Sequence, residues 1–537
     1  MNGAEAIVKC LENEGVETVF GYPGGAICPV YDCLMDSKIR SVLVRTEQNS
    51  AHAASGYARI SGKPGVCIVT SGPGATNLIT GIATAYADSI PLICITGQVT
   101  STLMGSDVFQ EADITGAAES FVKFSYVIRN ANDIPRIFKE AFYIASSGRK
   151  GPVLIDIPTD IQKAQLKKFQ YPEEVTLRSY KPTVKGNQNQ IKRFMKALSV
   201  SERPLICVGG GVHLSEAKSE VISFAEKYEI PIVSTMMGLS AVPTDHPLYL
   251  GMMGNNGCYA ANHALSECDL VIMVGARIAD RAINNPKSLL RNKVLVHIDV
   301  DPAEIGKNAP ASLPIVGDAK HIFEAISVEF IDPLNISDWK DRIAELRSHK
   351  QISENRKGFV NPSDFVHLLS YTMPNPSTYV ADVGQNQIWS CKNVYIKNGR
   401  FLTTGGMGCM GYAIPAAIGA KIASPETTTV CVCGDGGFQM SFLEFATARQ
   451  HNVPIKCVVM TNSYLGMVRQ IEDAGYNGRH AMVDLAGNPH LDKIAEAYDM
   501  DYMKLEDNDK TQEVIDRFLA DSNSVLLEVM IDPAENC

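Results

Sequence analysis

Short apolar runs rich in β-branched residues alternate with helix-length segments along the whole chain. The runs are bounded by Gly, Pro or Asp and have the length of buried strands. We expect strands at residues 66–70, 91–96, 153–157, 204–208, 270–274, 294–298, 429–433, 455–460 and 525–530. Strands that alternate with helices form parallel sheets covered by helices on both faces, so the pattern predicts an α/β fold.

Two polar stretches divide the chain into three such units. They lie at about residues 165–189 and 337–362 and have the composition of linkers. At roughly 100–200 residues per domain, a chain of 537 residues has room for three domains. The sequence therefore predicts three parallel-sheet α/β domains, at residues 1–165, 188–335 and 360–537.

Composition narrows the classes of function. The chain has 49 Lys and Arg against 59 Asp and Glu, a formal net charge of −10, and 45% hydrophobic residues. This is the composition of a globular protein and excludes a disordered one. Because the charge is negative and there is no long basic run, we expect neither nucleic acid nor an anionic membrane as a partner. No apolar run approaches the roughly 18 residues of a membrane-spanning helix.

The cysteines and the N-terminus bear on the compartment. The fourteen cysteines are scattered, include no Cys-x-x-Cys pair, and in several cases lie inside predicted strands. In a chain of this length such thiols are typically reduced core residues. The first residues lack the basic start and apolar stretch of a signal peptide. We therefore expect a cytoplasmic protein.

The strongest local signal for chemistry lies in the last third of the chain. Asp435, within Gly-Asp-Gly-Gly, follows a predicted strand at 428–433, and Asn462 follows the next strand at 454–460. The carboxyl ends of parallel strands meet at one edge of a sheet, so these two side chains should lie together. Two oxygen donors beside a glycine turn suit Mg²⁺ that keeps water or phosphate ligands. A turn with a capping Asp is the simpler interpretation of Gly-Asp-Gly taken alone.

Two neighbouring motifs are weaker. Ser441 and Glu444 have the spacing of a capping box, so we expect a helix to begin at Ser441. Residues 406–411 match the dinucleotide pattern G-x-G-x-x-G and precede a predicted helix at 413–422. No acidic residue follows at the end of a second strand with the expected spacing of about 20 residues, so this match is weak evidence for a nicotinamide site.

In the first third, Glu47 ends a predicted strand and precedes an Ala-rich helix at 50–58. A carboxylate there is most often a charge that complements the helix dipole. Further along, Thr-Ser-Gly-Pro-Gly-Ala-Thr-Asn at 70–77 has the pattern of a strand, a tight turn and a helix. By spacing alone this is either a loop that approaches a ligand closely or a simple turn.

Taken together, these segments resemble the thiamine-diphosphate-dependent enzymes, most closely the family of acetolactate (acetohydroxyacid) synthase large subunits. The likeness extends from about residue 3 to residue 535. The segments that carry it are 21–26, 45–48, 51–59, 70–77, 105–111, 275–281, 405–415, 434–436 with Asn462, and 465–470. The resemblance implies a pyrimidine-binding, a central and a pyrophosphate-binding domain, with active sites between subunits of a homodimer or homotetramer.

The implied reaction is acetolactate synthesis, in which pyruvate is decarboxylated on thiamine diphosphate (ThDP) and joined to a second 2-keto acid, mainly pyruvate. This implies a role in branched-chain amino acid biosynthesis. In the family, the residue matching Glu47 hydrogen-bonds the aminopyrimidine of ThDP. A desolvated Glu has its pKa raised toward neutrality, which suits such a proton exchange. The implied catalytic residues are Glu47, Gln110, Arg281 and Met410.

The resemblance also implies binding roles for two sets of residues. The residues implied to hold ThDP are Ser71, Pro73, Asn77, Val383, Gly384, Gln385, Asn386, Gly408, Met410, Asp435, Gly436, Gly437, Asn462, Tyr464, Gly466 and Met467, with Mg²⁺ on Asp435, Asn462 and the Tyr464 carbonyl. The residues implied to meet the substrates are Phe109, Gln110, Lys123, Arg281 and Ile471. A planar guanidinium such as that of Arg281 suits an acceptor carboxylate, and a surface ion pair is its simpler alternative.

The family's central domain carries FAD that takes no obvious redox part. The candidate contacts here are Gly209, Gly210, Gly211, Thr235, Met236, Gly275, Arg277, Asp299 and Asp318. An acidic residue at a strand end suits ribose hydroxyls. The alternative is an empty domain, as in relatives that have lost the flavin.

Two departures from the family pattern stand out. Ile471 stands where a Trp normally shapes the acceptor pocket and favours 2-ketobutyrate over pyruvate, which loosens the choice of acceptor. Asn386 stands where a His usually helps to hold the diphosphate, and we expect its amide still to donate to phosphate oxygen. Losing the Trp removes a large rigid wall. Another ThDP-dependent carboligase or a simple 2-keto-acid decarboxylase therefore stays open, as do a nicotinamide oxidoreductase and a non-catalytic binding protein. A separate small regulatory subunit is a possible partner by resemblance.

Overall fold

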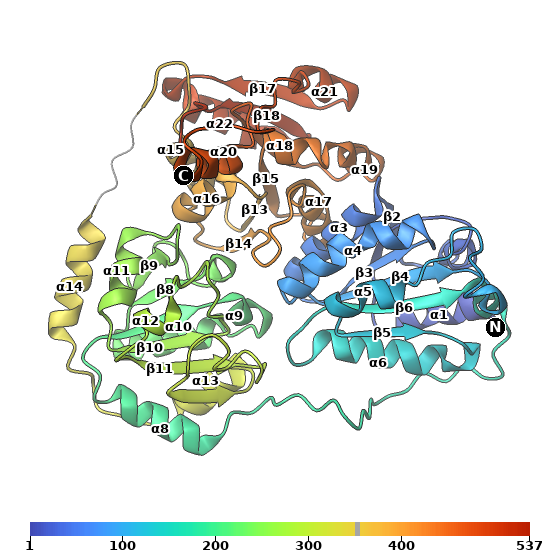
Figure 1. Cartoon of the computed structure of the whole chain (residues 1–537), viewed down its shortest axis with the longest axis horizontal. Coiled ribbons are helices and arrows are strands. Elements are labelled where there is room, and N and C mark those ends of the chain that lie inside the picture. The colour runs from blue at the N-terminus through green and yellow to red at the C-terminus, as the bar shows by residue number, and fades with distance from the viewer. Residues whose placement is uncertain (350–354) are drawn as a thin grey trace.

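The computed structural model describes residues 1–349 and 355–537 and contains three six-stranded sheets in which every strand pairing is parallel (Figure 1). Each sheet belongs to one domain with helices on both faces, which confirms the predicted fold class. All nine predicted strands are present, with ends shifted by two residues at most. In the described part of the chain no helix is long and apolar enough to cross a membrane.

The N-terminal domain has strand order β2-β1-β3-β4-β6-β5. Its strands are β1 Thr18–Tyr22, β2 Arg40–Leu43, β3 Gly65–Val69, β4 Leu92–Gln98, β5 Phe124–Val127 and β6 Val153–Pro158. Its helices are α1 Gly3–Asn13, α2 Cys28–Leu34, α3 Glu47–Ser61, α4 Pro73–Ala87, α5 Ile114–Ala118, α6 Ile134–Ser146 and α7 Thr159–Lys163. The predicted helix at 50–58 is therefore the middle of α3, which begins at Glu47 itself.

The central domain has strand order β12-β11-β10-β7-β8-β9. Its strands are β7 Pro204–Val208, β8 Ile232–Ser234, β9 Tyr249–Met252, β10 Leu270–Val274, β11 Val294–Asp299 and β12 Leu313–Val316. Its helices are α8 Gln188–Leu198, α9 Gly210–Leu214, α10 Lys218–Tyr228, α11 Tyr259–Glu267, α12 Pro286–Leu289, α13 Ala319–Ser327 and α14 Ser337–Ser348. Read from β9 to β12, this is the 3-2-1-4-5-6 order of dinucleotide-binding sheets.

The C-terminal domain has strand order β14-β13-β15-β16-β18-β17. Its strands are β13 Ser377–Ala381, β14 Gly399–Leu402, β15 Thr428–Gly434, β16 Lys456–Thr461, β17 Asp501–Leu505 and β18 Val525–Met530. Its helices are α15 Pro362–Thr372, α16 Gln385–Asn393, α17 Ala413–Ala423, α18 Asp435–Gln439, α19 Phe445–Gln450, α20 Gly466–Gly475, α21 Leu491–Ala497 and α22 Thr511–Ala520. Strand order reverses between β13 and β15, which places a ligand crevice at their carboxyl ends.

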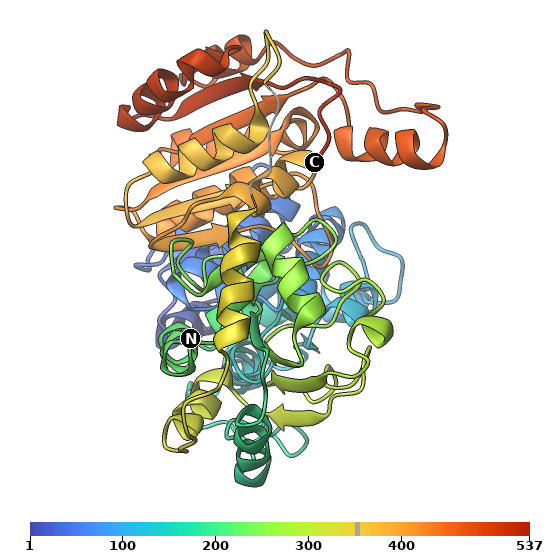
Figure 2. The ribbon, with the colours of Figure 1, turned by 90° about the vertical axis from the view of Figure 1, so that its left-hand side faces the viewer.

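The stretch predicted as the second linker begins with α14. This helix packs on the central domain, where Trp339 is buried and its indole N–H donates to the Pro204 carbonyl oxygen at 3.0 Å (Figure 2). Its polar composition comes from the face turned to solvent, because only Trp339, Ile343 and Leu346 of α14 are buried. The stretch predicted as the first linker has no helix or strand between Lys163 and Gln188.

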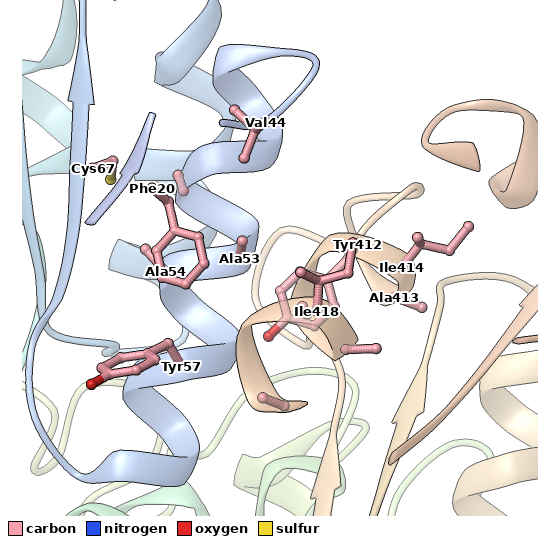
Figure 3. Packing of buried hydrophobic residues seen from close by; sticks show 14 of the residues in the cluster. Phe20, Val44, Ala53, Ala54, Tyr57, Cys67, Tyr412, Ala413, Ile414 and Ile418 are labelled. Atoms are coloured by element: carbon pink, nitrogen blue, oxygen red, sulfur yellow. The ribbon is translucent and has the colours of Figure 1, made fainter. Parts of the chain in front are cut away.

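The N-terminal and C-terminal domains share one hydrophobic core through α3 and α17 (Figure 3). Ala53 lies on the side of α3 that faces Tyr412 and α17, while Ala54 and Tyr57 lie on the opposite side, toward Phe20. The backbones nearly touch, since a Cβ on Gly419 would lie 1.8 Å from the Ala53 carbonyl oxygen. This contact fixes the orientation of α3, and with it the position of Glu47, relative to the C-terminal domain. The six cysteines at 67, 94, 207, 431, 433 and 457 are free and buried, as predicted.

Candidate active site

The carboxyl edge of the C-terminal sheet brings Asp435 and Asn462 together. β15 and β16 pair in parallel with Gly434 opposite Met460, so the residues that follow them leave the sheet at the same edge. Asp435 Oδ2 accepts hydrogen bonds from the Ser463 backbone N–H at 2.7 Å and from the Asn488 amide at 2.8 Å. The predicted juxtaposition is therefore present, and Asn488 is a partner that the sequence did not reveal.

This edge has the donors of a hard-cation site. Burial raises the pKa of Asp435, while the hydrogen bonds from Asn488 and Ser463 oppose the rise. A bound dication would favour the ionised carboxylate further. Asn462 is buried, and the Tyr464 N–H donates to its Oδ1 at 3.1 Å. Among the described residues no group of three or more His, Cys, Asp or Glu could hold a metal, so this site would combine one carboxylate with amide and carbonyl oxygens, which fits Mg²⁺.

Two helices begin beside these oxygens. α16 starts at Gln385, and α20 starts at Gly466. The Asn462 amide donates to Gln385 Oε1 at 3.0 Å, and a Cβ on Gly466 would lie only 1.9 Å from that same oxygen. A side chain at position 466 would have to displace the Gln385 amide from its contact with Asn462. Helix N-termini present unpaired N–H groups and partial positive charge, so the convergence suits a diphosphate.

Asn386 is placed differently from the expectation that its amide would donate to phosphate. Its Nδ2 donates to the Asp382 carbonyl oxygen at 2.9 Å and to the Val432 carbonyl oxygen at 3.1 Å. Both donors are therefore used to join the ends of β13 and β15. Asn386 therefore links the two strand ends in this chain, because its short side chain hydrogen-bonds the backbone of both and does not extend into the crevice.

Asp382, which sequence reasoning did not single out, organises the loop that contains Gly408 and Met410. Its carboxylate accepts from the backbone N–H groups of Val383 at 2.8 Å, Gly411 at 3.0 Å and Ala413 at 2.9 Å. Burial raises the pKa of Asp382 to about 6, and these donors oppose the rise. The G-x-G-x-x-G match at 406–411 is thus a loop fastened between β14 and α17.

The predicted capping box at Ser441 and Glu444 is wrong. Ser441 Oγ is buried without a partner, and the residues that follow form a 3₁₀ turn at Phe442–Glu444 before α19. The Glu444 carboxylate instead accepts from the backbone N–H groups of Arg45 and Thr46 in the N-terminal domain, at 2.9 and 3.3 Å. The Glu444 side chain is therefore used in a tertiary contact and does not form the capping box with Ser441.

The N-terminal domain supplies a separate group of predicted residues around Glu47. The Asn77 amide donates to Glu47 Oε2 at 3.0 Å, which joins the first residue of α3 to the first turn of α4. Ser71 is buried, and Pro73 begins α4. Gln110 lies against the intervening turn, because a Cβ on Gly72 would be 2.9 Å from its Cα. Phe109, by contrast, is 88% exposed.

The Lys123 side chain contacts neither the residues around Glu47 nor those at the carboxyl edge of the C-terminal sheet. Its ammonium donates to the carbonyl oxygens of Ile144 and Ser147 and to the Tyr180 hydroxyl, at the C-terminal end of α6. Cations are favourable at this end of a helix. Lys123 thus caps α6 in this chain, in contrast to the expected charge near the substrate.

A cavity of about 790 Å³ runs between the central and C-terminal domains and reaches the N-terminal domain. Arg281 lines it from the central domain, and Val383, Gly384, Gly408, Met467 and Ile471 line it from the C-terminal domain. Arg281 is exposed and forms no salt bridge with any described carboxylate, which disfavours the surface ion pair. Among the described residues, the predicted site residues of the N-terminal domain around Glu47 do not line this cavity; these are Glu47, Ser71, Pro73, Phe109 and Gln110.

The central-domain end of the cavity fits a dinucleotide. It lies where strand order reverses, between β7 and β10, and the Gly211 N–H donates to the Gly275 carbonyl oxygen at 2.9 Å across this switch point. Of the nine predicted flavin contacts, all but Gly209 line the cavity. Burial raises the pKa of Asp299 to about 6, and Asp318 caps α13 by accepting from the Lys320 N–H at 3.0 Å.

Arg149 of the N-terminal domain also lines this end, which sequence reasoning missed. Its guanidinium pairs with Glu304 at 2.7 Å and with Asp301 at 3.2 Å. The pair joins the N-terminal and central domains at the cavity wall. No motif surrounds Arg149 in the sequence, so only the tertiary structure reveals its position.

Comparison with known proteins agrees with this architecture. The chain matches the thiamine pyrophosphate enzyme N-terminal TPP binding domain at residues 1–117, the central domain at 191–326 and the C-terminal TPP binding domain at 382–529. The three sheets are thus the three domains of a thiamine pyrophosphate enzyme.

Named relatives narrow the class. The chain is 44% identical to the "Probable acetolactate synthase large subunit" of Methanocaldococcus jannaschii, over 100% of this chain and 93% of the relative. It is 42% identical to the "Acetolactate synthase large subunit" of Haemophilus influenzae, over 100% and 95%. It is 41% identical to the "Acetolactate synthase isozyme 3 large subunit" of Escherichia coli, over 93% and 88%. The chain belongs to the acetolactate synthase large-subunit family.

Proposed function

We propose that this protein is an acetolactate synthase catalytic subunit, which decarboxylates pyruvate on ThDP and joins the two-carbon fragment to a second 2-keto acid, mainly pyruvate, giving 2-acetolactate and CO₂. The observation that carries this proposal is the position of Arg281 and its lack of an ionic partner in the described part of the chain. Arg281 shares one cavity with Val383, Gly384 and Gly408 and lacks a carboxylate partner among the described residues. A guanidinium in that position can pair with the carboxylate of an acceptor keto acid. A decarboxylase that releases an aldehyde needs no such group.

Cofactor binding follows the geometry of the C-terminal edge. Asp435, Asn462 and the Tyr464 carbonyl would hold Mg²⁺, and the starts of α16 and α20 would bind the diphosphate. Met410 and Gly408 are held by the loop that Asp382 fastens. The central-domain residues that line the cavity would hold FAD by its dinucleotide, in a role without electron transfer. When bound, ThDP supplies the electron sink that keto-acid decarboxylation requires.

Individual residues of this chain would have separate roles in the reaction. Glu47, oriented by Asn77, exchanges a proton with the aminopyrimidine. Arg281 orients the acceptor through its carboxylate, and Gln110 and Phe109 flank the reacting carbon. Ile471 bounds the acceptor region of the cavity where the family has a larger ring. Without that aromatic surface, the longer side chain of 2-ketobutyrate loses an apolar contact that would favour it over pyruvate, so we propose pyruvate as the main acceptor.

The two groups of site residues support a composite site in a homodimer or a larger homo-oligomer. The Glu47 group and the Arg281 cavity belong to different parts of one chain, and no described residue of the Glu47 group lines that cavity. Surfaces beside both groups are open: Phe109 is 88% exposed, and none of the ten residues of α20 is buried. In Figure 2, α20 projects from the body of the molecule. A second copy would cover these surfaces and bring Glu47 of one copy to the cavity of the other.

We further propose the domain bounds 1–165, 188–335 and 360–537, with α14 following the central domain in sequence and packed on it, a cytoplasmic setting and a role in branched-chain amino acid biosynthesis. The fourteen free cysteines support the setting. Since the relatives are named large subunits, a small regulatory subunit is a proposed partner.

The experiment that tests the role of Arg281 is product analysis of an Arg281→Gln variant with pyruvate, ThDP, Mg²⁺ and FAD. We expect CO₂ release to continue while acetolactate falls at least tenfold and acetaldehyde appears. Arg136→Gln, at an exposed salt bridge on α6, is the control. An Arg281→Gln enzyme that makes acetolactate at the normal rate would contradict the proposal.

A further inference from the structure

A second, much smaller cavity lies where the three domains meet. Its volume is about 30 Å³, and we call it the junction cavity. Arg59 and Asp88 line it from the N-terminal domain, His213 and Met237 from the central domain, and Arg400 and Phe401 from the C-terminal domain. It adjoins the large cavity, since Asp88 and Met237 line both.

The only carboxylate among its lining residues is already committed. Asp88 pairs with the Arg59 guanidinium at 3.0 Å, and their side chains are 0% and 5% exposed. The other oxygen of Asp88 accepts from the Gly406 N–H at 2.8 Å. Arg59 also donates to the Thr403 carbonyl oxygen at 2.6 Å. Asp88 therefore neutralises one guanidinium and no more.

Arg400 leaves the junction cavity with an excess positive charge. It forms no salt bridge with any carboxylate in the described ranges. Burial and the nearby Arg59 lower the pKa of Arg400 to about 10, so it is still protonated at neutral pH. Close by, Lys218 donates to the Ser240 carbonyl oxygen at 3.0 Å, which adds another cation and no anion. Arg400 is half-buried and its Nε is fully buried, and a cation withdrawn from water in this way without a counter-charge is unfavourable.

Three buried polar atoms of the lining residues lack a partner: Nε of Arg59, Nε of Arg400 and Nδ1 of His213. Two of the three are N–H donors. His213 Nε2 lies 2.9 Å from the Leu239 carbonyl oxygen, so Nε2 carries the ring proton. Burial, Arg400 and Lys218 lower the pKa of His213 well below its usual value, so the ring is neutral. The positive charge of the junction cavity thus comes from Arg400.

We propose that the junction cavity binds one small monovalent inorganic anion, such as chloride, between Arg59 and Arg400. The anion would accept from the unpartnered Nε–H groups and supply the missing counter-charge. A water molecule needs about 10–15 Å³, so the junction cavity has room for one chloride-sized ion. Because the ion would bridge Arg59 of the N-terminal domain and Arg400 of the C-terminal domain, it would brace these two domains beside the large cavity.

The first test is thermal unfolding of the full-length protein at constant ionic strength while gluconate, which is too large for the junction cavity, is exchanged for chloride. We expect the unfolding midpoint to rise with chloride and to saturate. Arg400→Gln should remove this rise, whereas Arg136→Gln should keep it. A midpoint in the wild-type protein that does not respond to the exchange, or a response that Arg400→Gln retains, would overturn the proposal.

The second test needs no variant. Crystals of the wild-type protein grown with bromide in place of chloride should show one anomalous peak within hydrogen-bond distance of the guanidinium groups of Arg59 and Arg400. An ordered water without anomalous signal at this point would mean that the junction cavity is merely hydrated, and the proposal would fail. Neither test depends on catalytic activity, so neither rests on the proposed function.

Discussion

Glu444 of the C-terminal domain accepts a 2.9 Å hydrogen bond from the side-chain amide of Asn49, in the first turn of α3. The same carboxylate oxygen accepts from the backbone N–H groups of Arg45 and Thr46. Thr46, at the cap position of α3, makes no side-chain capping bond of its own. A buried residue of the C-terminal domain therefore anchors the backbone that leads into α3, the helix that begins with Glu47.

This anchor predicts that Glu444 positions Glu47. Glu444→Ala leaves three donors at the start of α3 without an acceptor, and each such loss costs about 1–3 kcal/mol of folding stability. We expect the variant to lose at least tenfold in kcat below its unfolding temperature, while Glu444→Gln, which keeps one carbonyl oxygen, recovers most of it. The exposed Glu496→Ala is the matched control. A folded Glu444→Ala enzyme with normal kcat would show that the contact between Glu444 and the start of α3 does not position Glu47.

Glu47→Gln tests the proton exchange itself. The amide keeps the size of the side chain and its contact with Asn77, but it cannot take part in the same proton transfer. General acid–base groups typically contribute about 10²–10⁴-fold, so we expect acetolactate formation to fall by at least 10²-fold. ThDP binding, measured by calorimetry, should change little. Normal turnover would exclude Glu47 from the chemistry, and lost binding would assign it a structural role.

Removing the metal should stop the reaction reversibly. We expect EDTA to abolish acetolactate formation and excess Mg²⁺ to restore it. Asp435→Asn should raise the Mg²⁺ concentration for half-maximal activity at least tenfold, because a carboxylate charge is lost from the oxygen donors. Asp516→Asn, on the surface helix α22, is the control. An unchanged Mg²⁺ dependence in Asp435→Asn would place the cation elsewhere.

Mixing Glu47→Gln with Asp435→Asn, at a Mg²⁺ concentration too low to activate Asp435→Asn, tests whether sites form between subunits. In a composite site, a dimer of one Glu47→Gln chain and one Asp435→Asn chain has one site with both changes and one with neither. Random pairing after co-refolding or co-expression should then restore about a quarter of the wild-type sites. If each site lay within one chain, every site in the mixture would carry one change, and activity would stay at the level of the single variants.

Ile471 predicts the choice of acceptor. Ile471→Trp adds a rigid wall to the cavity, and we expect the product ratio with equal pyruvate and 2-ketobutyrate to shift toward 2-acetohydroxybutyrate by several-fold. Ile471→Leu, of nearly equal volume, should leave the ratio close to that of the wild type. An unchanged ratio in Ile471→Trp would mean that other residues shape the acceptor pocket.

The predictions that the structure confirms rest on patterns that short stretches of sequence determine by themselves. Apolar runs such as 270–274 form strands because a strand buried on both faces must be apolar throughout. Asp435 and Asn462 meet because parallel strands align their carboxyl ends. The predictions that rested on one local motif or one family position differ from the structure where a tertiary partner competes.

Three residues show how that competition works. Glu444 leaves its own capping box because the start of α3 offers it three donors. Asn386 uses its amide protons on two carbonyl oxygens of neighbouring strands, and Lys123 caps α6. Residues such as Asp382 and Arg149 carry no sequence signal at all, because their partners lie in loops and domains brought together only by folding.

The most direct measurement is product analysis of the purified wild-type protein fed with pyruvate, in the presence and absence of ThDP and Mg²⁺. If the protein is an acetolactate synthase, acetolactate and CO₂ appear in equal amounts, and only when both cofactors are present. Acetaldehyde and CO₂ without acetolactate would contradict the ligation step, and no CO₂ from pyruvate would contradict the proposed donor.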